Sequence, residues 1–127
     1  MKLLAAQVNA DSLSELCTEA VRLLCRGDID TLAGRYGYAL SYSREPATAI
    51  REDLRRCLSE TGAASLVTGP ALPVPRVGFY PQPNSSNLVA GVECLVPADN
   101  GTNVLVELIV TTDGAAQYIT LEDLTAA

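Results

Sequence analysis

The stretch NLVAGVECLVPADNGTNVLVELIVTTDGAAQYITLEDL, residues 87–124, decides the fold. It predicts three consecutive antiparallel strands, because residues 88–96 and 104–112 are apolar and rich in Val and Ile. Turn-forming residues separate these strands at 98–101 and again at 113–114. We therefore expect most of the core, and the best candidate for a functional site, within this stretch.

The hydrophobic pattern sets the expected strand register. Pairing Pro97 with Asn103 gives one face that is almost wholly apolar, whereas a shift by one residue would mix apolar and polar side chains. That face holds Leu88, Ala90, Val92, Cys94, Val96, Val104, Val106, Leu108, Val110, Ile119 and Leu121. The opposite face holds Val89, Glu93, Leu95, Leu105, Glu107, Ile109, Tyr118 and Thr120. A two-residue turn after Thr112 would also place Glu107 opposite Thr120.

In this register Glu93 and Glu107 lie directly opposite one another. Like charges at a cross-strand pair are destabilising, so something must relieve the repulsion. Three arrangements would do so: exposure of both side chains to water, contact with a basic partner, or enclosure in a pocket where one carboxyl keeps its proton and serves as a general acid or base. Two carboxylates supply fewer oxygen ligands than Mg²⁺ or Ca²⁺ usually requires, and we expect no metal or other cofactor.

The chain has 127 residues, enough for one ordinary core, and 48% of them are hydrophobic. We expect a single α+β domain with a helical part over residues 1–62, a proline-rich connector over 63–86 and the meander over 87–124. The opening MKLLAA is followed by polar residues that keep its apolar run far shorter than that of a signal peptide. We therefore expect a cytoplasmic protein.

Several chemistries are excluded by residue type. The chain has no histidine, which rules out Ser-His-Asp and Cys-His catalysis. Its four cysteines are scattered over the predicted helices and one strand, and none forms a C-x-x-C pair. We expect four buried free thiols in place of a zinc site.

The net charge of −6 is concentrated in the second half of the chain. Residues 1–62 hold eight basic and nine acidic side chains, whereas residues 63–127 hold Arg76 against six acidic ones. An acidic sheet argues against nucleic acid and anionic membrane as partners. It suits a basic partner or a cation, although the same charge would also serve solubility alone.

Three helices are expected before the sheet. They are predicted over about 13–26, over about 29–36, and from Pro46 to the residue before Gly62. A capping box at Ser12–Glu15 would start the first helix, and Gly27 would end it. Residues 3–8 fit either an extra turn of this helix or a short strand. The mixed charges of the third helix indicate a solvated face with weak ion pairs.

Three of the five tyrosines gather where the second helix ends. Tyr36, Tyr38 and Tyr42 would form either a packing cluster or the mouth of a pocket lined with hydroxyl groups. Packing is the simpler interpretation. In the pocket interpretation, Thr120 would add its hydroxyl to the lining.

The connector is marked by its prolines. Five of the seven prolines fall within residues 63–86: Pro70, Pro73, Pro75, Pro81 and Pro83. Such a density forbids a central strand. It predicts an extended segment with one edge strand near residues 76–80.

Two segments carry a resemblance to a known superfamily: the helix corner LCRGDIDTL at residues 24–32 and the closing strand ITLEDL at residues 119–124. With helices preceding a meander, residues 12–124 resemble small bacterial members of the nuclear-transport-factor-like superfamily, which share a cystatin-like α+β cone and include immunity proteins of polymorphic toxin systems. The resemblance implies two or three helices packed on a curved antiparallel sheet of about four strands. Enzymes of the superfamily carry an Asp/His or Tyr/Asp pair in a pocket. Here only Tyr118 with Glu107 would stand in for it, which departs from the pattern.

We expect, first, a non-enzymatic binding protein similar to an immunity protein that occludes a basic bacterial toxin. Its contact surface would comprise Glu93, Glu107 and Tyr118 with the acidic turns at Asp99 and Asp113. The alternative is a small-molecule-binding protein, or an isomerase or hydratase, with a pocket between sheet and helices lined by tyrosines and by the same two glutamates. A homodimer packed through the sheet is compatible with either.

Overall fold

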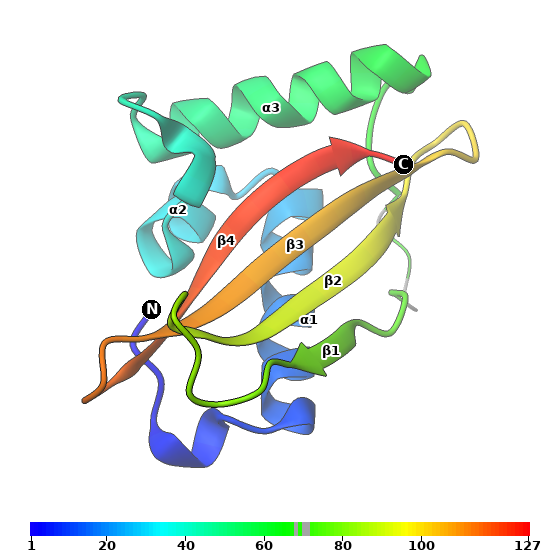
Figure 1. The fold of residues 1–127 in the computed structure, drawn as a ribbon. Helices are drawn as coiled ribbons and strands as arrows, with labels where there is room; N and C mark the ends of the chain where they lie inside the picture. The colour runs from blue at the N-terminus through cyan, green and yellow to red at the C-terminus, as the bar shows by residue number, and fades with distance from the viewer. Residues whose placement is uncertain (68, 70–71) are drawn as a thin grey trace.

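The computed structural model describes residues 1–67, 69 and 72–127. Its helices are α1 (Ala10–Arg26), α2 (Ile29–Tyr36) and α3 (Pro46–Thr61), with 3₁₀ turns at Ala5–Gln7 and Ala39–Ser41. Its strands are β1 (Arg76–Phe79), β2 (Leu88–Pro97), β3 (Asn103–Thr112) and β4 (Gln117–Ala126). The strands form one antiparallel sheet in the order β1-β2-β3-β4 (Figure 1).

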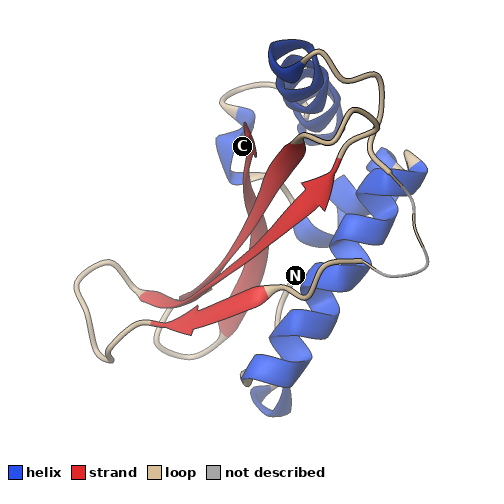
Figure 2. Ribbon diagram, turned by 90° about the vertical axis from the view of Figure 1, so that its right-hand side faces the viewer, coloured by secondary structure: helices blue, strands red, loops and turns tan. Residues whose placement is uncertain are grey.

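The helices lie on one face of this sheet (Figure 2). α1 contacts β1 and β2, whereas α3 contacts β4, so the two long helices cover different parts of the same face. The sheet is curved and does not close on itself (Figure 1). The α+β fold expected from the sequence, with helices packed on a curved antiparallel sheet, is confirmed.

The start of α1 differs from the predicted one. The helix begins at Ala10, and Asn9 caps it by accepting a 2.8 Å hydrogen bond from the backbone N–H of Ser12. The capping box expected at Ser12 is therefore wrong, because Asn9 is an equally good cap one turn earlier. At the other end Gly27, with a φ of 75°, closes the helix as predicted.

The bounds of α2 and α3 match the prediction. α2 spans Ile29–Tyr36, and α3 ends at Thr61, after which Gly62 has a φ of 74°. α3 begins at the predicted proline, and the residue before it, Glu45, caps the helix by accepting hydrogen bonds from the first backbone N–H groups. The sequence therefore determines these helix ends through glycine and proline, whose backbone limits are strict.

The β2–β3 register is the predicted one over most of its length, with Pro97 paired to Asn103. An irregularity near the start of β2 shifts the pairing between Leu88 and Ala90. As a result Val89 is buried, and Leu88, which the pattern placed in the core, is only partly buried. Because Leu88 and Val89 are both apolar, the sequence pattern fits either arrangement.

The β3–β4 register differs from the prediction. A two-residue turn would pair Thr112 with Ala115, but Thr112 pairs with Gln117. The loop is longer because Asp113 closes it: its backbone N–H donates to the carbonyl of Ala116 at 3.1 Å. The Asp113 carboxylate also accepts hydrogen bonds from the N–H groups of Ala115, at 2.9 Å, and Ala116, at 2.7 Å. An aspartate that binds its own loop thus replaces the tight turn.

A second irregularity in this hairpin lies between Glu107 and Leu108. The longer loop alone would pair Glu107 with Glu122, and this irregularity moves its partner to Asp123, whereas the sequence pattern predicts Thr120. Glu122 becomes the extra residue of β4, and its backbone has no direct counterpart in β3. The longer loop and this irregularity together bring two further acidic residues, Glu122 and Asp123, next to Glu107.

The core fills the space between the helices and the sheet. Its largest fully buried side chains are Leu13, Val21, Leu24, Leu32, Tyr36, Ile50, Val92, Val96, Leu108, Ile119, Leu121 and Leu124. All four cysteines are free: Cys17, Cys57 and Cys94 are buried, and Cys25 is partly buried. Burial raises the pKa of Cys17 to about 12, so this thiol stays protonated at neutral pH.

Residues 1–3 run along the outer edge of β4. The backbone N–H of Leu3 donates to the carbonyl of Gln117 at 2.8 Å, and that of Ile119 donates to the carbonyl of Met1 at 2.9 Å. The 3₁₀ turn that follows is separate from α1, so this segment contains both a piece of extended chain and a helical turn. No helix in the described ranges is long and apolar enough to cross a bilayer.

Candidate functional site

One face of the sheet, here termed the open face, is left uncovered by the described helices (Figure 2). Directly paired residues of neighbouring strands point to the same side of a sheet, so the register arranges the open face in rows. One row consists of Arg76, Glu93, Glu107 and Asp123, and the next of Gly78, Gly91, Ile109 and Thr120. Leu95 and Leu105 form a third row beside the charged one. The open face therefore combines carboxylates, apolar side chains and a strip without side chains.

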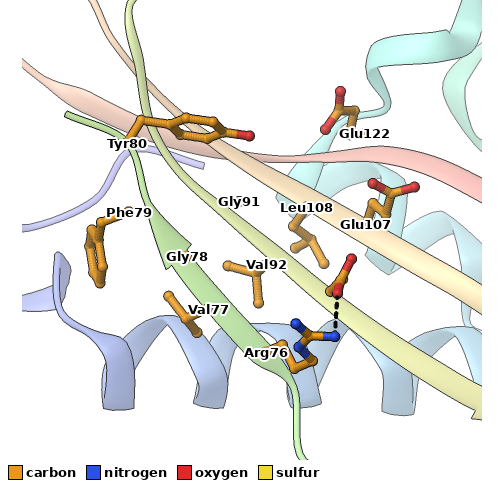
Figure 3. A pocket seen from close by; sticks show the side chains of 11 residues that line it. Arg76, Val77, Gly78, Phe79, Tyr80, Gly91, Val92, Glu107, Leu108 and Glu122 are labelled. Carbon is orange, nitrogen blue, oxygen red and sulfur yellow. Dashed lines mark ion pairs between the residues drawn. The ribbon is translucent and has the colours of Figure 1, made fainter. Parts of the chain in front are cut away.

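A hollow of about 340 Å³ lies on the open face over β1, β2 and β3. Its floor lacks side chains at Gly78 and Gly91, and the ring of Tyr80 lies along one side (Figure 3). A methyl group on Gly91 would lie 3.6 Å from the Tyr80 hydroxyl oxygen, an ordinary van der Waals contact, so the ring lies directly beside Gly91. The carboxylates of Glu107 and Glu122 border the hollow on another side (Figure 3).

Three glutamates meet beside this hollow. Glu93 and Glu107 are cross-strand partners, as predicted, and Glu122 joins them from the irregular part of β4. Partial burial raises the pKa of Glu107, and the neighbouring charges of Glu122, Asp123 and Glu93 raise it further. The cation beside them is Arg76, whose Nη1 lies 3.4 Å from Oε1 of Glu93 and whose side chain is 86% exposed. Such an exposed pair relieves the repulsion only in part.

The acidic turns lie at opposite ends of the sheet, away from the hollow. Asp99 and Asp113 each lie six residues along the chain from the nearer glutamate of the opposed pair, which is about 20 Å of extended strand. Asp99 accepts a 3.0 Å hydrogen bond from the N–H of Ala64. Backbone hydrogen bonds, first that of Ala116, lower the pKa of Asp113, and the Tyr118 hydroxyl donates to the same carboxylate at 3.2 Å. These residues therefore stabilise loops and do not line the hollow.

The residues proposed as pocket lining also lie apart from one another. Tyr36 is fully buried, and its hydroxyl donates to the carbonyl of Leu16 at 2.9 Å. Tyr38 is buried beside α3, whereas Tyr42 is 72% exposed in the loop before α3. Thr120 lies in β4. Tyr36 and Tyr38 thus act as packing residues, in line with the simpler interpretation of the tyrosine group.

A buried cluster around Asp53 corrects the interpretation of α3 as carrying only a solvated charged face. Asp53 is 6% exposed. The Tyr38 hydroxyl donates to its Oδ2 at 2.5 Å, and Arg44 donates to both carboxylate oxygens at 3.0 and 3.3 Å. Burial alone would raise the pKa of Asp53, but the hydrogen bonds from Arg44 and Tyr38 hold it below its usual range. Through Tyr38 and Arg44, which both donate to Asp53, the cluster links α3 to the segment between α2 and α3.

Three polar residues of the hollow are missing from the site residues predicted by the sequence: Arg76, Tyr80 and Glu122. The first two lie on or next to β1, the edge strand expected near residues 76–80, so the sequence did contain a signal for them. Glu122 had no such signal, because the longer β3–β4 loop, which pairs Thr112 with Gln117, is what shifts Glu122 alongside Glu107.

Comparison with known proteins gives no match: no family model fits the chain, and no curated protein or solved structure is similar to it. The chemistry of the site therefore depends on its own residues. Within the described residues, no group of three or more Cys, Asp or Glu side chains is placed to hold a metal ion. A depression lined by carboxylates beside an aromatic ring suits a cationic side chain better than an anionic ligand.

Proposed function

We propose that this chain is a binding protein whose open face contacts a basic protein partner. The observation that carries the proposal is the opposed Glu93–Glu107 pair on a sheet face that the described helices leave uncovered. A cation supplied by a partner would relieve the repulsion between these carboxylates. Binding would then gain an attraction and remove a repulsion that the free chain retains.

The open face also offers apolar contact area. Leu95 is 49% exposed and Tyr80 is 44% exposed, and the partly exposed Ile109 lies on the opposite side of the Glu93–Glu107 pair from Leu95. Apolar and aromatic side chains supply the centre of a typical protein interface, and charged side chains lie around it. The carboxylates would in addition steer a basic partner and speed association, so affinity should weaken as salt is added.

The finer proposal is an immunity protein that binds a cognate bacterial toxin in the cytoplasm and occludes a basic surface on it. Two observations support it. The charge of residues 63–127 is strongly acidic, with Arg76 against six acidic side chains. The corner at residues 24–32 and the closing strand at 119–124 resemble small bacterial nuclear-transport-factor-like proteins, among which immunity proteins are found.

An enclosed small-molecule or isomerase site has less support. Its expected lining is distributed over three places: the interior for Tyr36 and Tyr38, the open face for Glu93 and Glu107, and the start of β4 beside the Asp113 loop for Tyr118. Ligand pockets need their polar groups to converge in one cavity. The hollow on the open face is a shallower feature, suited to a side chain of a macromolecular partner.

Charge reversal tests the open face as the contact surface. In Glu93→Lys plus Glu107→Lys, we expect the Kd for an arginine-rich peptide to rise at least about tenfold, because two attractive contacts become repulsive. Isothermal titration calorimetry measures it. The control, Glu15→Lys plus Glu60→Lys, changes the net charge equally on exposed positions of α1 and α3 and should raise the Kd much less. Equal effects of the two pairs would reject the open face.

The immunity proposal is tested by growth of a bacterial host that expresses the product of the neighbouring reading frame. Co-expression of this chain should restore growth. The Glu93→Lys plus Glu107→Lys chain should fail to do so, whereas the helix control pair should succeed. Failure of the unaltered chain to restore growth would reject the immunity role, while the binding measurement would still decide whether the open face takes a basic partner.

A further inference from the structure

The two edge strands of the sheet, β4 and β1, differ in whether other segments of the chain cover their backbone. Along β4, residues 1–3 pair with the backbone, Tyr38 forms a parallel bridge to Leu121, and Arg56 donates to the carbonyl of Leu124 at 3.4 Å. β1 is the opposite edge, and no further strand of the described chain lies beyond it. An unpaired edge strand offers its backbone groups to another chain.

β1 directs the backbone of Val77 and Phe79 away from the sheet. The N–H of Tyr80 donates to the carbonyl of Val89 at 3.0 Å, so the Tyr80 backbone faces β2. Successive residues of an antiparallel strand alternate in this respect, so Gly78 also faces β2, while Val77 and Phe79 face outward. Their two N–H and two C=O groups have no hydrogen-bond partner among the described residues.

The sequence around β1 is nearly symmetric about Gly78. It reads Pro75-Arg76-Val77-Gly78-Phe79-Tyr80-Pro81, with an apolar residue on each side of the glycine and a proline at each end. Pro75 and Pro81 occupy outward-facing positions, and since proline lacks an N–H, neither leaves an unpaired donor beyond the strand. A strand that is symmetric about its centre can pair antiparallel with a second copy of itself.

Exposed apolar side chains gather at this edge. Val74 is 84% exposed, Phe79 is 52% exposed and Tyr80 is 44% exposed. Natural proteins blunt or cover such edges, because apolar side chains beside free backbone groups promote association. Here Arg76 and the two prolines limit the length that can pair but leave its centre free.

We propose that the chain forms a two-fold symmetric dimer in which β1 pairs antiparallel with β1 of a second copy, Gly78 lying opposite its own counterpart. Val77 then exchanges both backbone hydrogen bonds with Phe79 of the second copy, and the symmetric pair does the same, so all four outward groups are satisfied. On the helix side of the sheet, Phe79 is covered by Val77 of the other copy. On the open face, the Arg76 guanidinium lies against the Tyr80 ring of the other copy.

This register keeps the acidic clusters apart. Glu93 of the two copies would be separated by three strand spacings and by the four-residue offset between Arg76 and Tyr80, which together give roughly 20 Å. That distance exceeds the Debye length of about 8 Å at physiological ionic strength, so the mutual repulsion is largely screened. Each hollow stays open to a partner in the dimer. The dimer and the proposed function are therefore independent, and each can be rejected without the other.

Sedimentation equilibrium of the purified chain, from micromolar to millimolar concentration, tests the dimer. We expect a reversible monomer–dimer equilibrium, because the shared edge is short. Phe79→Asp should be monomeric at concentrations where the unaltered chain is dimeric, since it places a carboxylate opposite Val77 of the second copy. Leu95→Asp is the matched control: Leu95 is 49% exposed, close to the 52% of Phe79, but lies in the sheet face and not at the edge. It should dimerise normally.

A monomeric parent chain at millimolar concentration would overturn the proposal, as would a Phe79→Asp chain that is folded by circular dichroism and still dimerises. Loss of the dimer in Leu95→Asp alone would overturn it as well, because the copies would then meet through the open face.

Disulfide trapping tests the register. Gly78 and its counterpart would form a non-hydrogen-bonded pair with Cα atoms about 4.5 Å apart, which a disulfide can span. A Cβ added to Gly78 meets no atom within 4 Å, so Gly78→Cys should fold normally. We expect diamide to convert Gly78→Cys into a covalent dimer on non-reducing gels, much faster than Leu95→Cys or the parent chain. Equal rates for Gly78→Cys and Leu95→Cys would overturn the Gly78-centred pairing.

Discussion

At the level of single residues, Asp53 determines how α3 is attached. Among the described residues, Asp53 is the one charged residue that is buried. A buried carboxylate needs both hydrogen bonds and a nearby positive charge. Tyr38 and Arg44 supply them. Because these contacts lower the pKa of Asp53, they contribute stability above the ordinary aspartate pKa of about 3.9, and this contribution is lost as the pH falls through the lower folded-state value.

Asp53→Asn is predicted to lower the free energy of unfolding by about 2–3 kcal/mol at neutral pH, as measured by urea denaturation. The cost stays below that of breaking a fully buried pair because the Arg44 side chain is 30% exposed. Glu52→Gln removes a 50% exposed carboxylate from the same Arg44 and should change the free energy by less than about 0.5 kcal/mol. Similar losses in the two variants, or a loss that does not shrink in acid, would contradict this account.

At the level of elements, the helix ends show which local signals are strict. Gly27 and Gly62 adopt a left-handed backbone that favours glycine, and both ends were correctly predicted. The start of α1 was not, because Asn9 and Ser12 are both good capping residues and the sequence alone does not rank them. The structure assigns the cap to the Asn9 side chain, which binds the N–H of Ser12.

Asn9→Ala is therefore expected to lower the free energy of unfolding by about 1 kcal/mol, through loss of the capping hydrogen bond at 2.8 Å. Ser12→Ala should have little effect, because residue 12 lies inside α1 and Ala is well tolerated there. Thermal unfolding of the two variants compares them directly. If Ser12→Ala lowered the free energy of unfolding more than Asn9→Ala, Ser12 and not Asn9 would be the cap of α1.

At the level of the whole molecule, the predictable parts are those where two independent patterns agree. The β2–β3 register followed from alternation in two strands that share one apolar face, and with it came the opposed Glu93–Glu107 pair. The β3–β4 register failed because it depends on Asp113 binding its own loop and on an irregularity near Glu107, neither of which alters the apolar pattern. Glu122 joins the site through the register that this longer loop imposes, so it could not be predicted.

The uneven charge of the molecule also predicts that repulsion among the carboxylates of the open face lowers the stability of the free chain. The raised pKa of Glu107 means that the folded chain holds this proton more tightly than the unfolded chain does. The sign follows from proton linkage: stability of the parent chain increases as the pH falls through the folded-state pKa of Glu107, and decreases as the pH rises through it. A cation from a partner would offset this loss of stability, because it would neutralise the repulsion among the carboxylates of the open face. The proposed binding would therefore stabilise the fold.

Glu107→Gln should therefore raise the free energy of unfolding at neutral pH and low salt by about 0.5 kcal/mol, the scale of partly screened surface charges. The gain should shrink in mild acid, where the parent chain protonates Glu107, and also in moderate salt, which screens Glu93 and Glu122. Thermal unfolding across this grid of pH and salt measures both trends, with Glu15→Gln, at an exposed position of α1, as the control that should show neither. If the Glu107→Gln chain were less stable than the parent at neutral pH, the Glu107 carboxylate would make net favourable contacts in the free chain. The open face would then have no repulsion between carboxylates for a basic partner to relieve.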